Sequence, residues 1–130
     1  MTANNHFPNS TILKYLTKLA MNNEGVKGKW KLAAGIVLKN NLIATGVNSY
    51  KTHPMMAKYG KNSEAIFLHA EVNAISNALK LLEPAQLAKC DLYVVRVRRD
   101  GSYGCARPCC GCARAIGEFG LRNVYWTEDI

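Results

Sequence analysis

The chain has 130 residues, of which 48% are apolar and 20% are charged, and 17 Lys and Arg against 9 Asp and Glu give a net charge of +8. This length and composition predict one globular domain over residues 1–130. A membrane span is excluded, because no stretch approaches the roughly 18 apolar residues of a membrane helix. Residues 1–10 lack the apolar segment of a secretory signal, so we expect a cytoplasmic protein.

The first predicted element is a helix over residues 10–21, where apolar residues recur at helical spacing along one face. Asn9 or Ser10 can cap its start. Two apolar runs follow, at residues 32–38 and 42–47, with three polar residues between them. This pattern is typical of an antiparallel β-hairpin.

Residues 48–63 are polar and rich in turn-forming residues, and we interpret them as a functional loop over the site. Long loops in compact domains seldom lack a function. A second helix is expected to begin between residues 64 and 68. It should end at Leu82, because Glu83 and Pro84 follow.

Residues 91–98 predict a strand with a buried centre. The loop over residues 99–108 then contains an Asp-Gly turn signal. A third helix is predicted over residues 109–119, because a glycine follows it and favours a C-terminal stop. Residues 123–126 predict a short last strand.

The resulting order of elements is αββαβαβ. Strands that alternate with helices after a hairpin imply parallel pairing through crossover helices. The predicted fold class is therefore α/β, with a mixed central sheet and helices on both faces in a three-layer α/β/α arrangement.

Two short segments carry the candidate chemistry, residues 69–71 (His-Ala-Glu) and residues 108–112 (Pro-Cys-Cys-Gly-Cys). Together they match the His-x-Glu … Pro-Cys-x-x-Cys signature of the zinc-dependent base deaminases. The chain thus resembles the cytidine and deoxycytidylate deaminase superfamily, whose three-layer fold agrees with the predicted elements. The resemblance implies a Zn²⁺ cofactor held by His69, Cys109 and Cys112.

The residue types and their spacing support a catalytic metal site. Cys109 and Cys112 are three residues apart and share one face of a helix, and a helix start stabilises thiolates. His69 lies at the expected start of another helix. Both helices begin over the carboxyl ends of strands, where α/β folds bind ligands. Three protein ligands with an open fourth position are typical of catalytic zinc.

Two other interpretations of the cysteines stay open. A Cys-x-x-Cys pair alone also fits a redox pair, which would use neither His69 nor Glu71. A structural zinc site would need a fourth ligand, which Cys105 or Cys110 could supply. We expect Cys110 to point away from the site and Cys90 to be a small core residue.

The resemblance extends beyond the metal motifs and favours the deoxycytidylate branch. Residues 69–75 resemble the His-Ala-Glu-x-Asn-Ala-Ile segment of deoxycytidylate deaminases, and residues 108–116 resemble their Pro-Cys-x-x-Cys-Ala-x-x-Ile segment. Residues 46–48 and 120–125 also resemble segments of that family. The implied activity is hydrolytic deamination of a cytosine nucleotide or nucleoside, above all dCMP to dUMP, with release of ammonia.

Three further residues receive roles from the resemblance. Glu71 would take a proton from the attacking water and deliver it to the ring nitrogen and the leaving amine. Asn48 would hydrogen-bond the sugar or base, and its alternative role is a turn residue that closes a strand. The backbone N–H of Ala70, at a helix start, would bind the base carbonyl.

The chain departs from the family in two respects. Its predicted elements end without the fifth strand and last helix common in the superfamily, which predicts an open sheet edge that a homo-oligomer would cover. Residues 50–62 do not align with the deoxycytidylate enzymes, so phosphate recognition is unassigned. The candidates for it are Lys51, Lys58, Arg99 and Arg107. His53 is expected to be a loop residue or a substrate contact, and Tyr50 and Tyr103 either stack on a base or pack within the loops.

The net charge of +8 indicates a phosphate-bearing ligand, because a basic chain attracts phosphates on a nucleotide or a polymer. An alternative function is therefore a polynucleotide deaminase that acts on cytosine or adenine in single-stranded DNA or tRNA. A second alternative is a zinc-stabilised binding domain without catalysis. The flanking motifs favour the free nucleotide, and the intact Glu71 argues against a scaffold.

Overall fold

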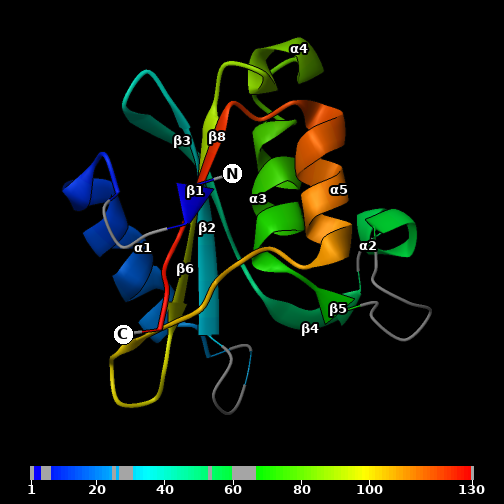
Figure 1. The fold of residues 1–130 in the computed structure, drawn as a ribbon. Helices are drawn as coiled ribbons and strands as arrows, with labels where there is room; N and C mark the ends of the chain where they lie inside the picture. Colours follow the sequence, from blue (N-terminus) through cyan, green and yellow to red (C-terminus); the bar gives the residue numbers. More distant parts are fainter. Residues whose placement is uncertain are drawn as a thin grey trace.

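A six-stranded sheet with helices on both faces forms the centre of the structure (Figure 1). The structure is a computed structural model that describes residues 2–3, 7–24, 26, 31–52, 54–59 and 67–129. The strands of this sheet are β1 (Thr2–Ala3), β2 (Lys31–Leu38), β3 (Asn41–Val47), β6 (Asp91–Val97), β7 (Tyr103–Gly104) and β8 (Asn123–Trp126). The predicted α/β class with a mixed sheet is confirmed.

The order of the strands is β1-β8-β6-β2-β3, and β7 pairs with β6. β8 is parallel to β6 and to β1, whereas β2 is antiparallel to β3 and to β6. The predicted parallel pairing is therefore right for β6 with β8 and wrong for β6 with β2, which are antiparallel. The reason is that the connection from β3 to β6 crosses over β2, which keeps β3 and β6 parallel without pairing them. The sheet edge expected to be open beyond β8 carries β1.

Helix α1 (Ser10–Met21) covers one face of the sheet. Asn9 caps it as predicted, since its side chain accepts a hydrogen bond from the backbone N–H of Ile12 at 3.1 Å. The buried face of the helix, with Leu16 at its centre, packs against Tyr93 of β6. The apolar periodicity of the sequence therefore predicted both this helix and the side that it buries.

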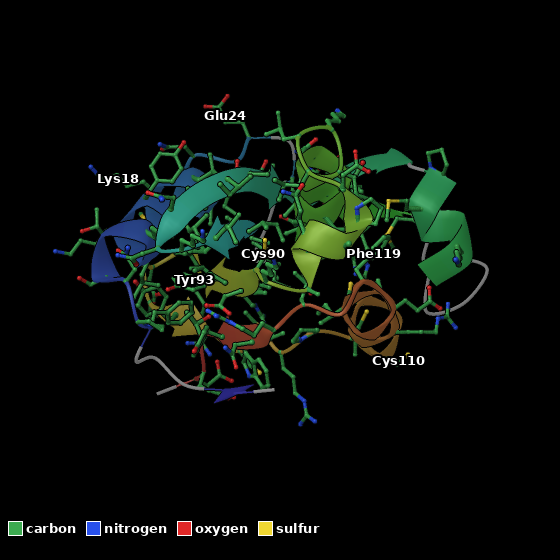
Figure 2. The ribbon with its side chains drawn as sticks, turned by 90° about the horizontal axis from the view of Figure 1, so that it is seen from above. Lys18, Glu24, Cys90, Tyr93, Cys110 and Phe119 are labelled. Atoms are coloured by element: carbon green, nitrogen blue, oxygen red, sulfur yellow. The ribbon has the colours of Figure 1, made fainter. Side chains whose placement is uncertain are left out.

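Helices α3 (Ala70–Ala78) and α5 (Cys110–Phe119) cover the opposite face, and the short helix α4 (Pro84–Leu87) lies before β6. A view along the layers shows α1 on one side of the sheet and α3 and α5 on the other (Figure 2). Because side chains alternate along a strand, Leu92 and Val94 of β6 point to the α3 and α5 side, away from α1. In the part of the chain that the structure describes, no helix has the length and apolarity needed to cross a membrane.

The segment expected to be a loop contains regular structure in its described part. Strand β4 (Ser49–Thr52) is followed by helix α2 (Pro54–Tyr59). β4 pairs with β5 (Phe67–Leu68) in a separate two-stranded sheet. Turn-forming residues could not reveal this pairing, because the partner strand lies well along the chain. His53 lies outside the described residues.

The second predicted helix is shorter than expected. Its expected start lies partly in residues 60–66, outside the described residues, and α3 begins at Ala70. The helix ends at Ala78, where a backbone hydrogen bond joins residues only three apart: the N–H of Leu81 donates to the Ala78 carbonyl at 2.9 Å. The apolar pattern continues to residue 82 because these turn residues still pack against the core.

Helix α3 makes a very close contact with strand β3 at Gly46. A Cβ atom at position 46 would lie 2.4 Å from the backbone nitrogen of Ala74 and 2.8 Å from the carbonyl oxygen of Ala70. The side-chain amide of Asn73 donates to the Val47 carbonyl at 3.0 Å. The first turn of α3 is thereby held directly over the end of β3, which is the edge of the sheet where the candidate site lies.

We expect Gly46→Ala to lower the free energy of unfolding by about 3 kcal/mol, because the new methyl group overlaps backbone atoms that cannot rotate away. Gly117→Ala in α5 is the matched control. Among the described residues, no atom beyond the neighbouring backbone of α5 lies within 4 Å of its added Cβ, and alanine in a helix should raise the stability by about 0.4–1 kcal/mol. Urea unfolding of the two variants measures both effects. Equal stabilities would contradict the close contact of α3 with β3.

Candidate active site

The predicted metal ligands lie at the starts of two helices that meet at one edge of the sheet. His69 is the N-cap of α3 and Cys109 is the N-cap of α5, and both have extended backbone angles. The Cys109 sulfur accepts a hydrogen bond from the backbone N–H of Cys112 at 3.5 Å. A helix start presents N–H groups and the positive end of the helix dipole, and both stabilise a thiolate.

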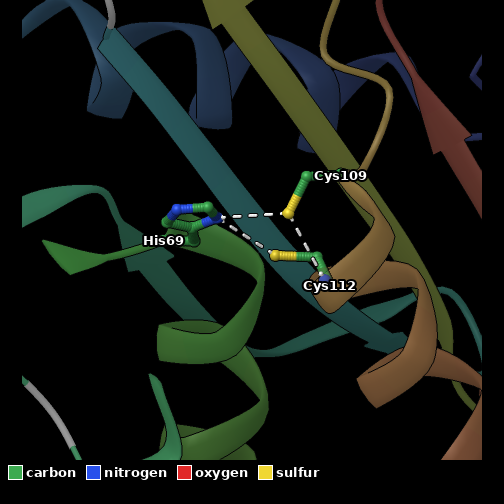
Figure 3. Close-up of side chains that lie close together, drawn as sticks. All are labelled: His69, Cys109 and Cys112. Carbon is green, nitrogen blue, oxygen red and sulfur yellow. Dashed lines mark hydrogen bonds between the residues drawn. The ribbon is translucent and has the colours of Figure 1, made fainter. Parts of the chain in front are cut away.

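The three side chains converge on one point (Figure 3). Nδ1 of His69 lies 3.3 Å from Sγ of Cys112 and 3.6 Å from Sγ of Cys109, and the three ligand atoms all lie within 4.8 Å of one another. Tetrahedral zinc with ordinary bond lengths separates a nitrogen ligand from a sulfur ligand by about 3.6 Å. The donor set and its spacing fit Zn²⁺.

The other cysteines lie outside this cluster. Among the described residues, neither Cys105 nor Cys110 joins the group of His69, Cys109 and Cys112. Cys110 is exposed on the outer side of α5, as expected (Figure 2). A site with three protein ligands favours catalytic over structural zinc, and the presence of a histidine beside both thiols argues against a redox pair. Cys90 is a buried core residue, as predicted.

The ligands perturb one another's protonation. A hydrogen bond from Cys112 lowers the pKa of Cys109 to about 3, and the contact with His69 acts in the same direction. The same hydrogen bond raises the pKa of Cys112, which keeps the proton that the two sulfurs would otherwise share. The hydrogen bond to Cys109 also raises the pKa of His69. One thiolate is thus preformed, and a metal displaces the remaining protons.

Glu71, in the first turn of α3, is only 4% exposed. Burial raises the pKa of its carboxyl group, while its own backbone N–H and the charge of His69 oppose the shift. A raised pKa beside a metal-binding cluster suits a group that both accepts and returns a proton near neutral pH.

A cavity of about 320 Å³ opens over these residues. All but one of the predicted site residues line it: Asn48, His69, Ala70, Glu71 and Cys109. The exception, Cys112, is buried. Ala70 contributes the first backbone N–H of α3, and the first N–H groups of a helix have no acceptor within the helix.

Asn48 is held in one orientation at the end of β3. Its Oδ1 accepts hydrogen bonds from the backbone N–H of Leu32 and from Nδ2 of Asn23, each at 3.0 Å. Because a backbone N–H can only donate, this pairing identifies the Asn48 oxygen and therefore the position of its NH₂ group. The side chain closes the strand, as its alternative role required, and it also lines the cavity.

Thr127 holds the segment that leads into α5. The fully buried hydroxyl donates to the Gly104 carbonyl at 2.7 Å and accepts from the backbone N–H of Arg96 at 3.1 Å. The Thr127 carbonyl accepts from the N–H of Ala106 at 2.9 Å. The approach to the metal-binding cysteines is therefore tied to β6, to β7 and to the residue that follows β8.

Of the four candidate phosphate-binding residues, Arg107 lines the cavity. Lys58 forms an ion pair with Glu118 at 3.5 Å, Arg99 lines neighbouring hollows, and the Lys51 side chain lies outside the described residues. Tyr103 packs as a loop anchor, with its hydroxyl 2.9 Å from that of Thr17. Tyr50 is exposed and does not line the cavity.

Two residues that were not predicted from the sequence, Arg96 and Asn23, also contribute to the site. Arg96 lines the cavity from β6. A signal for it was available, because strand alternation places residue 96 on the same face as Leu92 and Val94. Asn23 is 8% exposed and follows a helix end. Nothing in its local sequence distinguishes it from an ordinary turn asparagine.

The model of a protein family, the cytidine and deoxycytidylate deaminase zinc-binding region, matches residues 8–128. No protein with a curated description matches the chain. Among solved structures, the guanine deaminase from Bacillus subtilis is 29% identical with a TM-score of 0.61, over 94% of this chain and 65% of that one. The chain thus spans slightly less than two thirds of that enzyme's length.

Two further solved structures share the fold. The dCMP deaminase from cyanophage S-TIM5 is 23% identical, with a TM-score of 0.58 over 92% of this chain and 86% of that one. A tRNA:A34 deaminase that performs A-to-I editing at the wobble position is 25% identical. Its TM-score is 0.56 over 92% of this chain and 78% of that one. The three relatives act on a purine base, a pyrimidine nucleotide and a tRNA, so the fold is compatible with several substrates.

The affinity for Zn²⁺ should fall as the pH decreases from about 8 to about 6, because His69, whose pKa is raised, and Cys112 must both lose a proton to bind metal. Competition of the apoprotein with a coloured chelator measures the affinity. Cys112→Ser should weaken zinc binding strongly, whereas the control Cys110→Ser should bind like the wild type. An affinity that does not change with pH would contradict these shifts.

Proposed function

Since the chain belongs to the family of cytidine and deoxycytidylate deaminases, we propose that it hydrolyses the amine from a cytosine nucleotide or nucleoside, above all dCMP to dUMP, and releases ammonia. One observation carries this proposal: Asn48, Ala70 and Glu71 line the same cavity as the ligand cluster. A nucleophile site, a proton carrier and substrate-orienting groups are the parts that this reaction needs.

In this proposal His69, Cys109 and Cys112 hold Zn²⁺. The two thiolates and the neutral imidazole balance the charge of the ion, and three ligands leave a fourth position open. The metal supplies Lewis acidity, which makes a water easier to deprotonate at neutral pH. Helix starts at both ligand segments stabilise the thiolates that the site requires.

Glu71 carries the protons. Its carboxylate takes a proton from the attacking water and gives it to the ring nitrogen beside the amine-bearing carbon. The remaining proton of the adding hydroxyl group then passes to the amine, which leaves as ammonia. A carboxyl group with a pKa raised by burial is suited to both steps, because it holds an accepted proton more readily than an exposed carboxylate until it passes the proton on.

Asn48 and Ala70 orient the substrate. The NH₂ group of Asn48 is suited to an acceptor on the sugar or the base, since its oxygen is used by Leu32 and Asn23. The backbone N–H of Ala70 is suited to the carbonyl group of the base. A ring held at both ends would present its amine-bearing carbon at one fixed position.

The alternative substrate is cytosine or adenine within single-stranded DNA or tRNA. The net charge of +8 supports a polyanionic substrate, whereas the flanking sequence motifs support the free nucleotide. We also propose that the 130 residues act as one deaminase domain in the cytoplasm and assemble as a homo-oligomer. The five cysteines, which form no disulfide among the described residues, are consistent with a reducing compartment.

Glu71→Gln should lower kcat by about 10²–10⁴-fold, because the amide keeps the shape of the side chain and cannot accept the proton of water. Zinc content, measured by metal analysis, should stay at the wild-type value. A variant that keeps both its zinc and its activity would reject Glu71 as the proton carrier, whereas a zinc-loaded wild type without any activity would favour a zinc-stabilised binding domain.

A substrate panel tests the proposal most directly. Zinc-loaded protein is mixed separately with cytidine, deoxycytidine, dCMP, dCTP, guanine, a cytosine-containing single strand and an adenosine-containing RNA, and ammonia release is followed. We expect dCMP to give the highest kcat/KM. Turnover of the single strand or the RNA alone would favour the polynucleotide alternative, and turnover of guanine alone would reject a cytosine substrate.

A further inference from the structure

Arg96 is a cationic side chain built into the wall of the active-site cavity. It lies near the carboxyl end of β6, on the face that carries α3 and α5, where Leu92 and Val94 are fully buried. Its side chain is partly buried, and Nη1 donates to the Cys105 carbonyl at 3.3 Å. A charged residue at a position where the strand otherwise buries apolar residues indicates a specific role.

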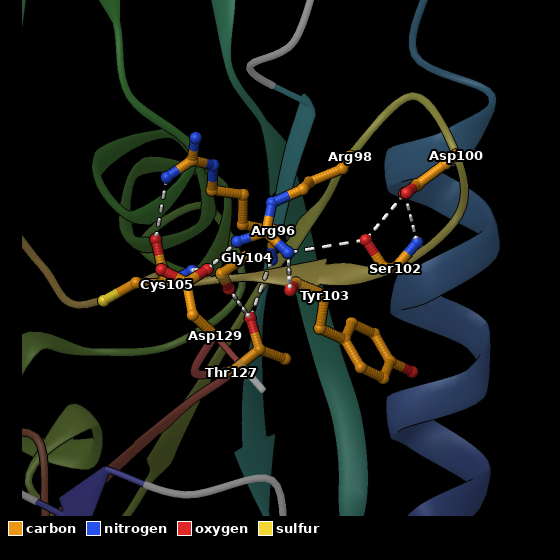
Figure 4. A network of polar contacts seen from close by, with 9 residues as sticks. All are labelled: Arg96, Arg98, Asp100, Ser102, Tyr103, Gly104, Cys105, Thr127 and Asp129. Carbon is orange, nitrogen blue, oxygen red and sulfur yellow. Dashed lines mark hydrogen bonds and ion pairs between the residues drawn. The ribbon is translucent and has the colours of Figure 1, made fainter.

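Gly104 on the paired strand β7 provides the space for this side chain. A Cβ atom at position 104 would lie 3.1 Å from both Cδ and Nε of Arg96. The Gly104 carbonyl is held by the buried hydroxyl of Thr127, which also accepts from the Arg96 backbone. Figure 4 shows the arginine passing along Gly104 and ending beside Cys105. These contacts therefore hold the guanidinium of Arg96 in position before any ligand binds.

The same arginine belongs to two hollows. One is the active-site cavity, and the other has a volume of about 330 Å³ and lies against the β6–β7 hairpin, where Arg98, Arg99 and Asp100 complete its lining. Arg96 thus lines both the place where a base would lie and a second space of similar size.

The second hollow is positively charged. Three arginines and one carboxylate, Asp100, line it, and Asp100 accepts hydrogen bonds from the N–H and the hydroxyl of Ser102 at 3.0 and 2.6 Å. Arg98 pairs with Asp129 and donates to the Tyr103 carbonyl. Arg107 adds a positive charge on the side of the active-site cavity. A guanidinium is the side chain best suited to a phosphate, because it is planar and always charged.

We propose that the hollow beyond Arg96 is an anion subsite that receives the phosphate of the substrate, with Arg96 as the binding group. This inference rests on the proposed function, and it narrows the substrate class to a phosphorylated free nucleotide rather than a nucleoside or a free base. Arg99 and Arg107 attract the phosphate through their charge. Arg98 instead stabilises the β6–β7 hairpin through its contacts with Tyr103 and Asp129.

The test measures binding and does not depend on turnover. Zinc-loaded full-length protein is titrated by calorimetry with dUMP, deoxyuridine and inorganic phosphate. The wild type should bind dUMP about 10–100-fold more tightly than deoxyuridine, as expected for charged hydrogen bonds to one phosphate. Arg96→Gln should abolish this ratio and leave the affinity for deoxyuridine unchanged, which also reports an intact fold.

Two further variants separate the site from a general effect of charge. Gly104→Ala changes no charge but displaces the guanidinium, so it should also reduce the preference for dUMP. Lys18→Gln removes one charge from the exposed surface of α1, on the opposite face of the sheet, and should keep the wild-type ratio (Figure 2). A wild-type ratio in Arg96→Gln, or equal binding of dUMP and deoxyuridine by the wild type, overturns the proposal.

The subsite and the activity can fail separately. Turnover of deoxycytidine with no gain from a phosphate rejects the subsite and keeps the deaminase. Binding of dUMP that depends on Arg96, without deamination of any cytosine compound, supports the subsite and rejects the activity. A short cytosine-containing single strand is the last ligand to be tested. If Arg96→Gln weakens only the binding of the strand, the phosphate belongs to a polynucleotide and the assignment to a free nucleotide is wrong.

Discussion

The contact between helix α3 and strand β3 at Gly46 is the constraint on which the site depends. Backbone atoms of the helix lie where a side chain at position 46 would be. Two asparagines of the helix donate to strand carbonyls, Asn73 to Val47 and Asn77 to Thr45. A helix bound to the strand at this distance cannot shift along it. The first residues of α3, which carry the candidate histidine and glutamate, are therefore placed at the sheet edge by backbone packing.

The second half of the site depends on a different contact. The segment before α5 is held by Thr127, which bonds to β6, to β7 and to the segment itself. The parallel crossover from β6 to β8 then brings the start of α5 against the start of α3. Two helix starts that face each other concentrate N–H groups and positive potential in one place. Two thiols and a buried carboxyl group, which would be costly elsewhere, are compatible with this environment.

Much of the fold and of the candidate site could be predicted from the sequence. The helix at residues 10–21, the hairpin and the strands at 91–97 and 123–126 follow from apolar periodicity, which acts over a few residues. The metal cluster follows from short motifs, because each half lies within one helix turn. The strand pair β4–β5 and the hairpin strand β7 were not predicted, since their short pairings depend on partners outside the local pattern.

The sequence by itself determined which residues are the candidate metal ligands, because ligand chemistry depends on residue type and on spacing within a turn. It also determined that a carboxylate lies two positions from the histidine. Only the tertiary structure decided that Arg96 lines the same cavity as these residues and that Asn23 holds Asn48 in place there. Their positions result from strand pairing and from the packing of a helix end, which join residues far apart in the chain. A local pattern contains no information on such contacts, so the sequence indicated the chemistry of the site but not the residues that surround it.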